Sequence, residues 1–218
     1  MISQTLGTLA RRWLPRAAQR SREELHDYWR DTRDAANAPE LYVGEKESQR
    51  RRSEFLVELV SRHVATDERI LELGCNVGRN LHYLAAGGYR YLVGLDINER
   101  ALALARSAFP DTAGRAQLIS GPVEEIVTRF SDGEFGLVFT MAVLEHIHTT
   151  SEFVFAEMAR IGRALITIED ERSISERHFP RNYADVFTAL GLRELEHHRC
   201  ETHGLPRGFI ARVFCSSS

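Results

Sequence analysis

Lysine is almost absent from this chain, and cysteine is scarce. Of the 28 lysine and arginine residues, only Lys46 is a lysine. The three cysteines, Cys75, Cys200 and Cys215, are widely spaced and form no C-x-x-C pair, which argues against a disulfide framework and against a zinc site. No apolar run approaches the roughly 18 residues of a membrane-spanning helix. We therefore expect a cytoplasmic protein with reduced thiols.

The composition and charge are those of an ordinary globular domain. A length of 218 residues suits one domain with additions, and 43% of the residues are hydrophobic. The formal net charge is −3, so no general field attracts polyanions, and a nucleic-acid partner is not expected.

The first 22 residues carry five arginines and no acidic residue. Such a start resembles a mitochondrial transit peptide. The alternative is an N-terminal helix, which we favour because arginine is abundant along the whole chain.

The most informative stretch is 69–80, which reads R-I-L-E-L-G-C-N-V-G-R-N. A short apolar run ends at Gly74, a second glycine follows at Gly78, and an apolar helical pattern then begins. This order predicts a strand, a tight turn and a helix. Glycines let the backbone turn sharply and approach a ligand closely, and the helix start presents free N–H groups to an anionic group.

The glycine spacing distinguishes between cofactors. A dinucleotide fold needs G-x-G-x-x-G, whereas Asn76 stands between the two glycines here. The stretch resembles motif I of the class I S-adenosylmethionine (SAM) methyltransferases, E/D-x-G-x-G-x-G, and asparagine tolerates the left-handed backbone of that position. This resemblance implies that Glu72 lies near the cofactor amine and that Gly74, Cys75 and Gly78 hold its methionine end. An ordinary strand-to-helix turn is the alternative.

A second predicted strand covers residues 89–98 and ends near Asp96. An acid about 20 residues after the glycine turn can accept hydrogen bonds from both ribose hydroxyls. Both SAM and NAD enzymes use this device, so Asp96 indicates an adenosine cofactor without choosing between them. Asn98 is a better cap for the next helix, expected at 99–109. The resemblance also implies that Ile97 packs on the adenine.

The third predicted strand and its exit, residues 115–126, depart from the family pattern. Related sequences often read G-D-A-E here, with the aspartate near the adenine amine, but Pro122 takes its place in this chain. Proline cannot accept a hydrogen bond from that amine. Adenine recognition then falls to the Val123 backbone or to Glu124.

Residues 131–147, S-D-G-E-F-G-L-V-F-T-M-A-V-L-E-H-I, contain the fourth predicted strand, Phe135–Thr140. The stretch closely resembles D-G-x-F-D-L-V-x-x-x-x-V-L-E-H-I of small-molecule methyltransferases, such as those of ubiquinone and menaquinone synthesis. Gly136 replaces their usual aspartate. The resemblance covers about 69–170 and implies that Thr140 and Met141 lie near the methyl donor.

Several methyltransferase types are excluded by what this stretch and the chain lack. Residues 140–143, T-M-A-V, are not the N/D-P-P-Y/F of amino-methyltransferases, and no Pro-Cys nucleophile for cytosine C5 stands there. A single lysine excludes the K-D-K-E ribose methyltransferases. A catechol-type magnesium enzyme needs an aspartate at the end of strand four, which is absent.

The histidines near the fourth strand raise the question of catalysis. His146 and His148 form H-x-H, but residues i and i+2 of a helix do not share a face and no third ligand is nearby, so no metal is expected. His146 titrates near neutral pH and is a candidate general base. Packing beside the cofactor is an equal alternative. Glu169, which ends a fifth strand at 161–170, and His178 are further candidates for acceptor positioning or base.

Two segments are candidates for binding the methyl acceptor. Helices expected at 21–34 and 45–64, with a loop between them, precede the glycine turn, and in such methyltransferases they often cover the cofactor. The loop at 171–183 is rich in arginine, which suits a polar or anionic acceptor. Simple packing and ion pairing within the loop are the alternatives. The candidate acceptor contacts are Tyr28, Trp29, Tyr42, Arg177, Arg181 and Tyr183, with Asn37 beside them.

Together these observations predict an α/β, Rossmann-like fold. We expect a seven-stranded, mostly parallel sheet with helices on both faces, closed by an antiparallel pair at 192–199 and 209–215. Residues 1–64 would form a helical cover and 65–218 the SAM-binding domain. The predicted activity is SAM-dependent methyl transfer to an oxygen or nitrogen of a small molecule.

Two other functions stay open: a methyltransferase acting on protein or RNA, and a SAM- or nucleotide-binding regulator without catalysis. The expected partner is a small-molecule acceptor, with no membrane association, and the chain would be a monomer or a homodimer.

Overall fold

The structure is a computed structural model that describes residues 19–32, 36–44 and 46–216. Most of the arginine-rich start lies outside these residues, so both interpretations of that segment stay predictions. No helix in the described part of the chain combines the length and the apolar character needed to cross a membrane.

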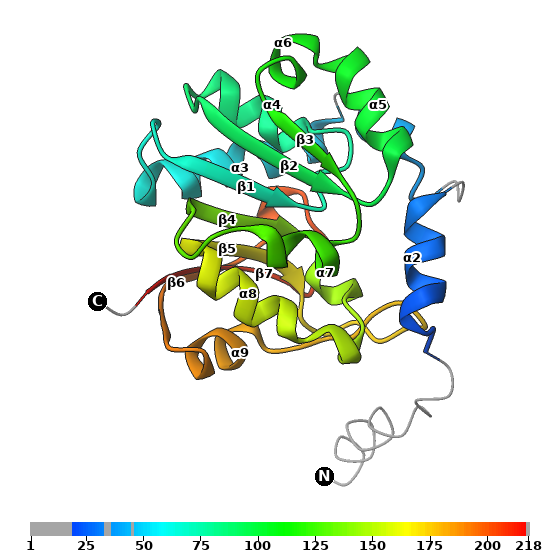
Figure 1. Cartoon of the computed structure of the whole chain (residues 1–218), viewed down its shortest axis with the longest axis vertical. Helices are drawn as coiled ribbons and strands as arrows, with labels where there is room; N and C mark the ends of the chain where they lie inside the picture. Colours follow the sequence, from blue (N-terminus) through cyan, green and yellow to red (C-terminus); the bar gives the residue numbers. More distant parts are fainter. Residues whose placement is uncertain (1–18, 33–35, 45, 217–218) are drawn as a thin grey trace, which may run out of the picture.

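One seven-stranded sheet runs through the centre of the molecule (Figure 1). Its strands pair in parallel from β3 to β5, and β7 then pairs antiparallel with both β5 and β6. In spatial order they are β3 (Gln117–Ser120), β2 (Tyr91–Asp96), β1 (Arg69–Leu73), β4 (Phe135–Met141), β5 (Gly162–Asp170), β7 (Phe209–Ser216) and β6 (Leu192–Arg199). The predicted fold class is confirmed.

Helices cover both faces because the central strands are apolar on both sides. Leu137 and Phe139 of β4 face one core and Val138 faces the other. The first core is covered by α3 (Glu47–His63), α4 (Arg79–Ala86) and Leu102 of α5 (Glu99–Ala108), and the second by α7 (Val123–Ile126), α8 (Phe153–Ile161) and α9 (Tyr183–Ala189).

The remaining elements are short. They are α2 (Arg22–Arg30), α6 (Pro110–Ala113), η3 (Pro39–Tyr42), η4 (Val127–Arg129), η5 (Leu144–His146), η6 (Thr149–Ser151) and η7 (Glu201–His203). The helix predicted from Ser21 has a complete capping box with Glu24, but it ends at Arg30. At that end Thr32 turns back, and its hydroxyl donates to the Tyr28 carbonyl at 2.9 Å.

The carboxyl ends of the parallel strands lie at one edge of the sheet, and α2 stands at that edge (Figure 1). The turn after β1, the end of β2 and the segment after β4 therefore meet beneath α2. In open parallel sheets this edge is where ligands bind, because neighbouring connections leave in opposite directions there.

Candidate functional site

The turn after β1 holds three residues in the left-handed backbone region: Gly74 (φ 68°), Asn76 (φ 50°) and Gly78 (φ 70°). A Cβ at Gly74 would lie 2.4 Å from Cγ2 of Val143, so the segment after β4 approaches too closely for any side chain. The backbone N–H of Asn76 donates to Oδ2 of Asp96 at 2.7 Å. The turn is thereby tied to the end of β2.

A cavity of about 600 Å³ opens beside this turn. Eight of the residues predicted to bind the cofactor line it: Glu72, Gly74, Cys75, Asp96, Ile97, Val123, Glu124 and Met141. Gly78 and Thr140 do not. Gly78 is the N-cap residue of α4, and Thr140 is fully buried within β4.

Asp96 is fixed by two backbone donors. Its Oδ2 accepts from Asn76, and its Oδ1 accepts from the N–H of Asn98 at 2.8 Å. Burial raises the pKa of Asp96 above its ordinary value, and these donors oppose the rise. A carboxylate oxygen can accept more than one hydrogen bond, so each oxygen keeps capacity for a hydroxyl donor from the cavity.

Glu72 is a buried acid whose second oxygen is unsatisfied. Its Oε1 accepts from Nδ2 of Asn80 at 2.8 Å, whereas Oε2 is buried without a hydrogen-bond partner. Burial raises the pKa of Glu72 to about 8. A cationic amine in the cavity would give Oε2 a partner and favour the charged carboxylate, so the site fits an ammonium group.

Two arginines that the sequence did not single out, Arg52 of α3 and Arg79 of α4, also line the cavity. Nε of Arg52 donates to the Gly204 carbonyl at 2.7 Å, and Nε of Arg79 donates to Oγ of Ser53 at 3.2 Å. Nη1 of Arg79 is buried without a hydrogen-bond partner. Within the described residues neither guanidinium pairs with a carboxylate, so this corner fits an anionic group. The position of Arg79 directly after the second glycine was the available signal.

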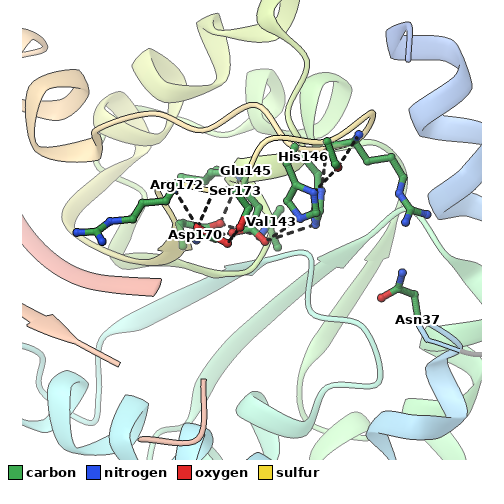
Figure 2. A network of polar contacts seen from close by, with 12 residues as sticks. Asn37, Val143, Glu145, His146, Asp170, Arg172 and Ser173 are labelled. Carbon is green, nitrogen blue, oxygen red and sulfur yellow. Dashed lines mark hydrogen bonds and ion pairs between the residues drawn. The ribbon is translucent and has the colours of Figure 1, made fainter. Parts of the chain in front are cut away.

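The far end of the cavity holds Glu145 and His146 (Figure 2), and the His178 ring lies 4.7 Å from the His146 ring. Oε1 of Glu145 lies 3.6 Å from Nε2 of His146 and 3.8 Å from Nε2 of His178. Oε2 of Glu145 accepts from the backbone N–H of Asp170. Burial and the neighbouring Glu169 raise the pKa of Glu145 to about 9, and burial lowers the pKa of His146 to about 4.

His146 has a defined orientation because its Nδ1 lies 2.8 Å from the carbonyl of Arg177. A carbonyl only accepts, so Nδ1 carries the proton and Nε2 is the free nitrogen. His148 does not share this arrangement, since its Nδ1 accepts from the N–H of Thr150 at 3.2 Å and caps η6. The histidine beside His146 is thus His178, 32 residues along the chain.

Glu169 lies beneath the cavity and does not line it. It is fully buried, and its Oε2 accepts from the N–H groups of Val143 at 2.9 Å and Glu145 at 3.3 Å. Burial raises the pKa of Glu169 to about 7. Its contacts are therefore with the backbone that carries η5.

The α2 and η3 segments close one side of the cavity. The Trp29 ring lies 4.6 Å from the His146 ring, and its carbonyl accepts from Nδ2 of Asn98 at 3.2 Å. Trp29, Tyr42 and Arg177 line the cavity, as does Asn37. Tyr28 lies one layer further out, where the Arg177 guanidinium covers its ring at 4.1 Å.

The structure does not bring Arg181 and Tyr183 to the cavity. Nε of Arg181 donates to Oε1 of Glu152 at 3.0 Å, and its Nη2 donates to the Ile147 carbonyl at 3.0 Å. Tyr183 is fully buried in the second core, beside Phe187. Their contacts join the 171–182 segment to the α8 side of the sheet.

Comparison with known proteins identifies a domain within the chain. A family model described as a methyltransferase domain matches residues 70–164. No curated protein sequence matches the chain.

Solved structures share the fold at low identity. Magnesium protoporphyrin IX methyltransferase from Synechocystis PCC 6803, with bound S-adenosylhomocysteine, is 15% identical, with a TM-score of 0.68 over 90% of this chain and 100% of that chain. A SAM-dependent methyltransferase from Mesorhizobium loti is 14% identical, with a TM-score of 0.59 over 75% of this chain and 97% of that one.

The [4+2]-cyclase SpnF also shares the fold, with 12% identity and a TM-score of 0.60 over 75% of this chain and 81% of that chain. Similarity at these identities establishes the fold, and the family match establishes the domain. The predicted class of SAM-dependent methyltransferases is thereby confirmed, whereas the resemblance to the enzymes of ubiquinone and menaquinone synthesis stays a prediction. The chain carries, over residues 70–164, a methyltransferase domain within the fold of the class I SAM-dependent methyltransferases.

Proposed function

We propose that this protein transfers a methyl group from SAM to an oxygen or nitrogen of a small molecule bound in the same cavity. SAM supplies an electrophilic methyl group on a sulfonium. One observation carries the proposal: a single cavity of about 600 Å³ joins the glycine turn to the His146 end. That volume lies in the range of small-molecule sites.

At the donor end, charged groups match the parts of SAM. Asp96 accepts hydrogen bonds from the ribose hydroxyls, and Glu72 binds the ammonium group. Arg79 and Arg52 bind the methionine carboxylate, which supplies the missing partner of the buried Nη1 of Arg79. This pairing matches both charged groups of the amino-acid end of SAM.

The adenine lies against apolar and backbone groups in this proposal. Ile97 packs on the ring, and Val123 and Glu124 lie at its edge. Oε1 of Glu124 is already 3.2 Å from Nε2 of His26, so α2 contributes to the wall of the adenine pocket.

At the acceptor end, Trp29 and Arg177 shape the wall, and His146 lines the cavity with Nε2 as its free ring nitrogen. Tyr42 lies nearer the donor end, where its ring centroid is 6.0 Å from the Arg79 guanidinium. The Arg177 carbonyl fixes the tautomer in which Nε2 of His146 accepts a proton. A hydroxyl or ammonium acceptor gives its proton to His146, and alignment supplies most of the acceleration. Effective molarities of about 10⁵ M and above are known for oriented reactants.

A small acceptor is favoured over a macromolecule by charge and by cover. The formal net charge is −3, and α2 stands over the strand ends. A polyanion needs an open, basic groove.

Calorimetric titration with SAM, S-adenosylhomocysteine and NAD tests the donor end. We expect micromolar affinity for the two sulfur compounds, loss of both in Asp96→Ala, and retention in Asp111→Ala, an exposed control. Binding of NAD alone, or no binding of either sulfur compound by folded protein, contradicts the proposal.

The acceptor class needs a separate measurement. Release of S-adenosylhomocysteine is followed with panels of small hydroxyl and amine compounds, and with protein and RNA preparations. Turnover with a small compound supports the proposal, whereas methylation only of protein or RNA overturns the acceptor class and leaves the donor site intact.

A further inference from the structure

Glu145, His146 and His178 present three donor atoms to one point at the end of the cavity. Each offers one ligand atom, and the three atoms lie within 4.8 Å of one another. The carboxylate oxygen is 3.6 Å and 3.8 Å from the two Nε2 atoms. Donors around a tetrahedral ion with bonds of about 2.1 Å stand about 3.4 Å apart, so these two separations need to close by only a few tenths of an ångström.

In both imidazoles, Nδ1 has a hydrogen-bond partner of its own. Nδ1 of His146 donates to the Arg177 carbonyl at 2.8 Å, and Nδ1 of His178 lies 2.6 Å from Oγ of Ser175. Histidines that ligate a metal typically hold their other ring nitrogen in this way, because that bond fixes the ring and its tautomer. In both rings it is Nε2 that lies near Glu145.

Three acidic side chains lie around this point, and among the described residues no arginine or lysine forms an ion pair with them. Glu145, Glu169 and Asp170 are all buried. Among the described residues the ion pairs of Glu145 are with His146 and His178, and Glu169 and Asp170 form none with arginine or lysine. Oε1 of Glu169 is buried without a hydrogen-bond partner. Buried carboxylates are ordinarily paired or bound to a metal.

We propose that Glu145, His146 and His178 bind one divalent transition-metal ion. Two imidazoles and one carboxylate suit Zn²⁺, Co²⁺ or Fe²⁺, whereas Mg²⁺ prefers an all-oxygen set. The remaining coordination positions face the cavity. His148, which the sequence places beside His146, takes no part because it caps η6.

The ion has a consequence for the acceptor, and this step alone rests on the proposed function. With the ion bound, Nε2 of His146 is a ligand and no longer the base. An acceptor hydroxyl that ligates the ion gives its proton to solvent instead, since the ion stabilises the resulting oxygen anion. The acceptor class is then an oxygen compound able to ligate a metal.

Metal titration of the full chain, without SAM or acceptor, tests the site. Chelator-treated protein is titrated with Co²⁺, followed by its visible absorption, and with Zn²⁺ by calorimetry. We expect one equivalent to bind, at least tenfold weaker binding in His178→Ala and in Glu145→Gln, and unchanged binding in His148→Ala. Mg²⁺ should not compete.

Circular dichroism and S-adenosylhomocysteine binding show whether each variant is folded. Failure of Co²⁺ and Zn²⁺ to bind folded protein overturns the site, as does equal loss in His148→Ala and His178→Ala. Retained S-adenosylhomocysteine binding with no metal binding overturns the metal site alone. The reverse pattern overturns the proposed function alone.

Discussion

Gly136 shows how a single position departs from related sequences for a local reason. It is buried in β4, where similar methyltransferases carry an aspartate. A Cβ there would lie 2.6 Å from Oε2 and 2.8 Å from Cβ of Glu68, and Glu68 pairs with Arg163. The glycine makes room for that acid, so the departure is explained by its neighbour.

We expect Gly136→Asp to lower the free energy of unfolding by about 2 kcal/mol or more, since overpacking costs about 1–3 kcal/mol and two carboxylates would face each other. Gly136→Ala should cost less. Urea denaturation measures both, and Glu68→Gly, which removes both contacting atoms, should recover most of the loss in the double variant. An equal loss with and without Glu68 contradicts this explanation.

Glu72 links stability to pH in the cofactor-free protein. Its pKa is about 8 when folded, against an ordinary value of 4.5, so the folded state holds the proton more tightly. The resulting stabilisation is complete below pH 4.5 and is lost as pH rises toward 8.

Glu72→Gln stays neutral and should flatten that decline. The unfolding free energy of the variant minus that of the natural chain should be more than about 1 kcal/mol larger at pH 8 than at pH 5. One pKa unit corresponds to about 1.4 kcal/mol. Urea denaturation at several pH values measures the gain. Exposed Glu125→Gln is the control, and a parallel pH profile for both variants contradicts the expectation.

Motif order located the donor residues in the sequence, but not the groups that face one another across the fold. Asp96 and Glu72 follow from the motif, and both line the cavity, although their roles stay predictions. From the sequence we argued that His146 and His148 do not share a helix face. In the structure His146 contacts the Arg177 carbonyl, whereas His148 contacts the N–H of Thr150. The contact with His178 depends on a loop that returns from 32 residues away, which no local pattern encodes.

Among the elements, α2 is held by few contacts. It has nine residues and one buried residue, Leu25, and helices this short are marginal alone. Hydrogen exchange should therefore be faster in α2 than in α3 in the free protein, and it should slow when S-adenosylhomocysteine binds. Leu25→Ala should speed exchange in α2 and leave α8 unchanged. Equal exchange in α2 and α3 would show that α2 is part of the stable core.

Another contact between elements ties α3 to β6 through Glu196. Partial burial opposes ionisation, but hydrogen bonds from His63 and His198 and the charge of Arg62 lower the pKa of Glu196 to about 2. A depressed acid stabilises the fold above pH 4.5, and this contribution disappears as pH falls toward 2.

Glu196→Gln should lower the unfolding free energy by about 1 kcal/mol at pH 6, and the difference should shrink at pH 3. Urea midpoints at both values measure the change. Glu201→Gln, on the exposed η7, serves as the control. A difference that persists unchanged at pH 3 means that the loss does not come from the ionised carboxylate.

The order of helices and strands followed from the sequence, but the start of one helix shows what sequence patterns do not predict. From the sequence we placed Tyr183 in the loop at 171–183, whereas α9 begins at Tyr183. Asn182 caps it, with its Oδ1 accepting from the N–H of Ala184 at 3.0 Å, and Tyr183 fills the second core. Local propensity does not reveal that burial, since it comes from α8 and β7.

At the scale of the whole molecule, the sheet order explains why the cavity lies where it does. β1 pairs with β2 on one side and with β4 on the other, so the chain leaves the two neighbours in opposite directions. The crevice between these connections holds the turn at Gly74. Apolar runs in the sequence identify the strands. Their order in the sheet depends on pairing between distant segments, so it was implied only by the family resemblance.

Cofactor binding should stabilise the molecule globally. At 100 times its dissociation constant, a ligand adds about 2.7 kcal/mol to the free energy of unfolding, which corresponds to roughly 5–11 °C in Tm for a chain of this size. Differential scanning fluorimetry with S-adenosylhomocysteine should show this shift. Asp96→Ala should lose it, and Asp111→Ala should keep it; a shift that survives in Asp96→Ala contradicts the assigned role of that carboxylate.

The walls of the cavity come from different parts of the chain. Glu72 and Asp96 lie inside the family-matched stretch 70–164, whereas Trp29, Tyr42 and Arg177 lie outside it, in the flanking segments. Under the proposed function, most donor-binding residues thus lie inside this stretch, with Arg52 as an exception, whereas Trp29 and Arg177 of the acceptor end lie outside it. Sequence changes in the segments outside 70–164 can therefore change which acceptor is methylated while SAM remains the methyl donor.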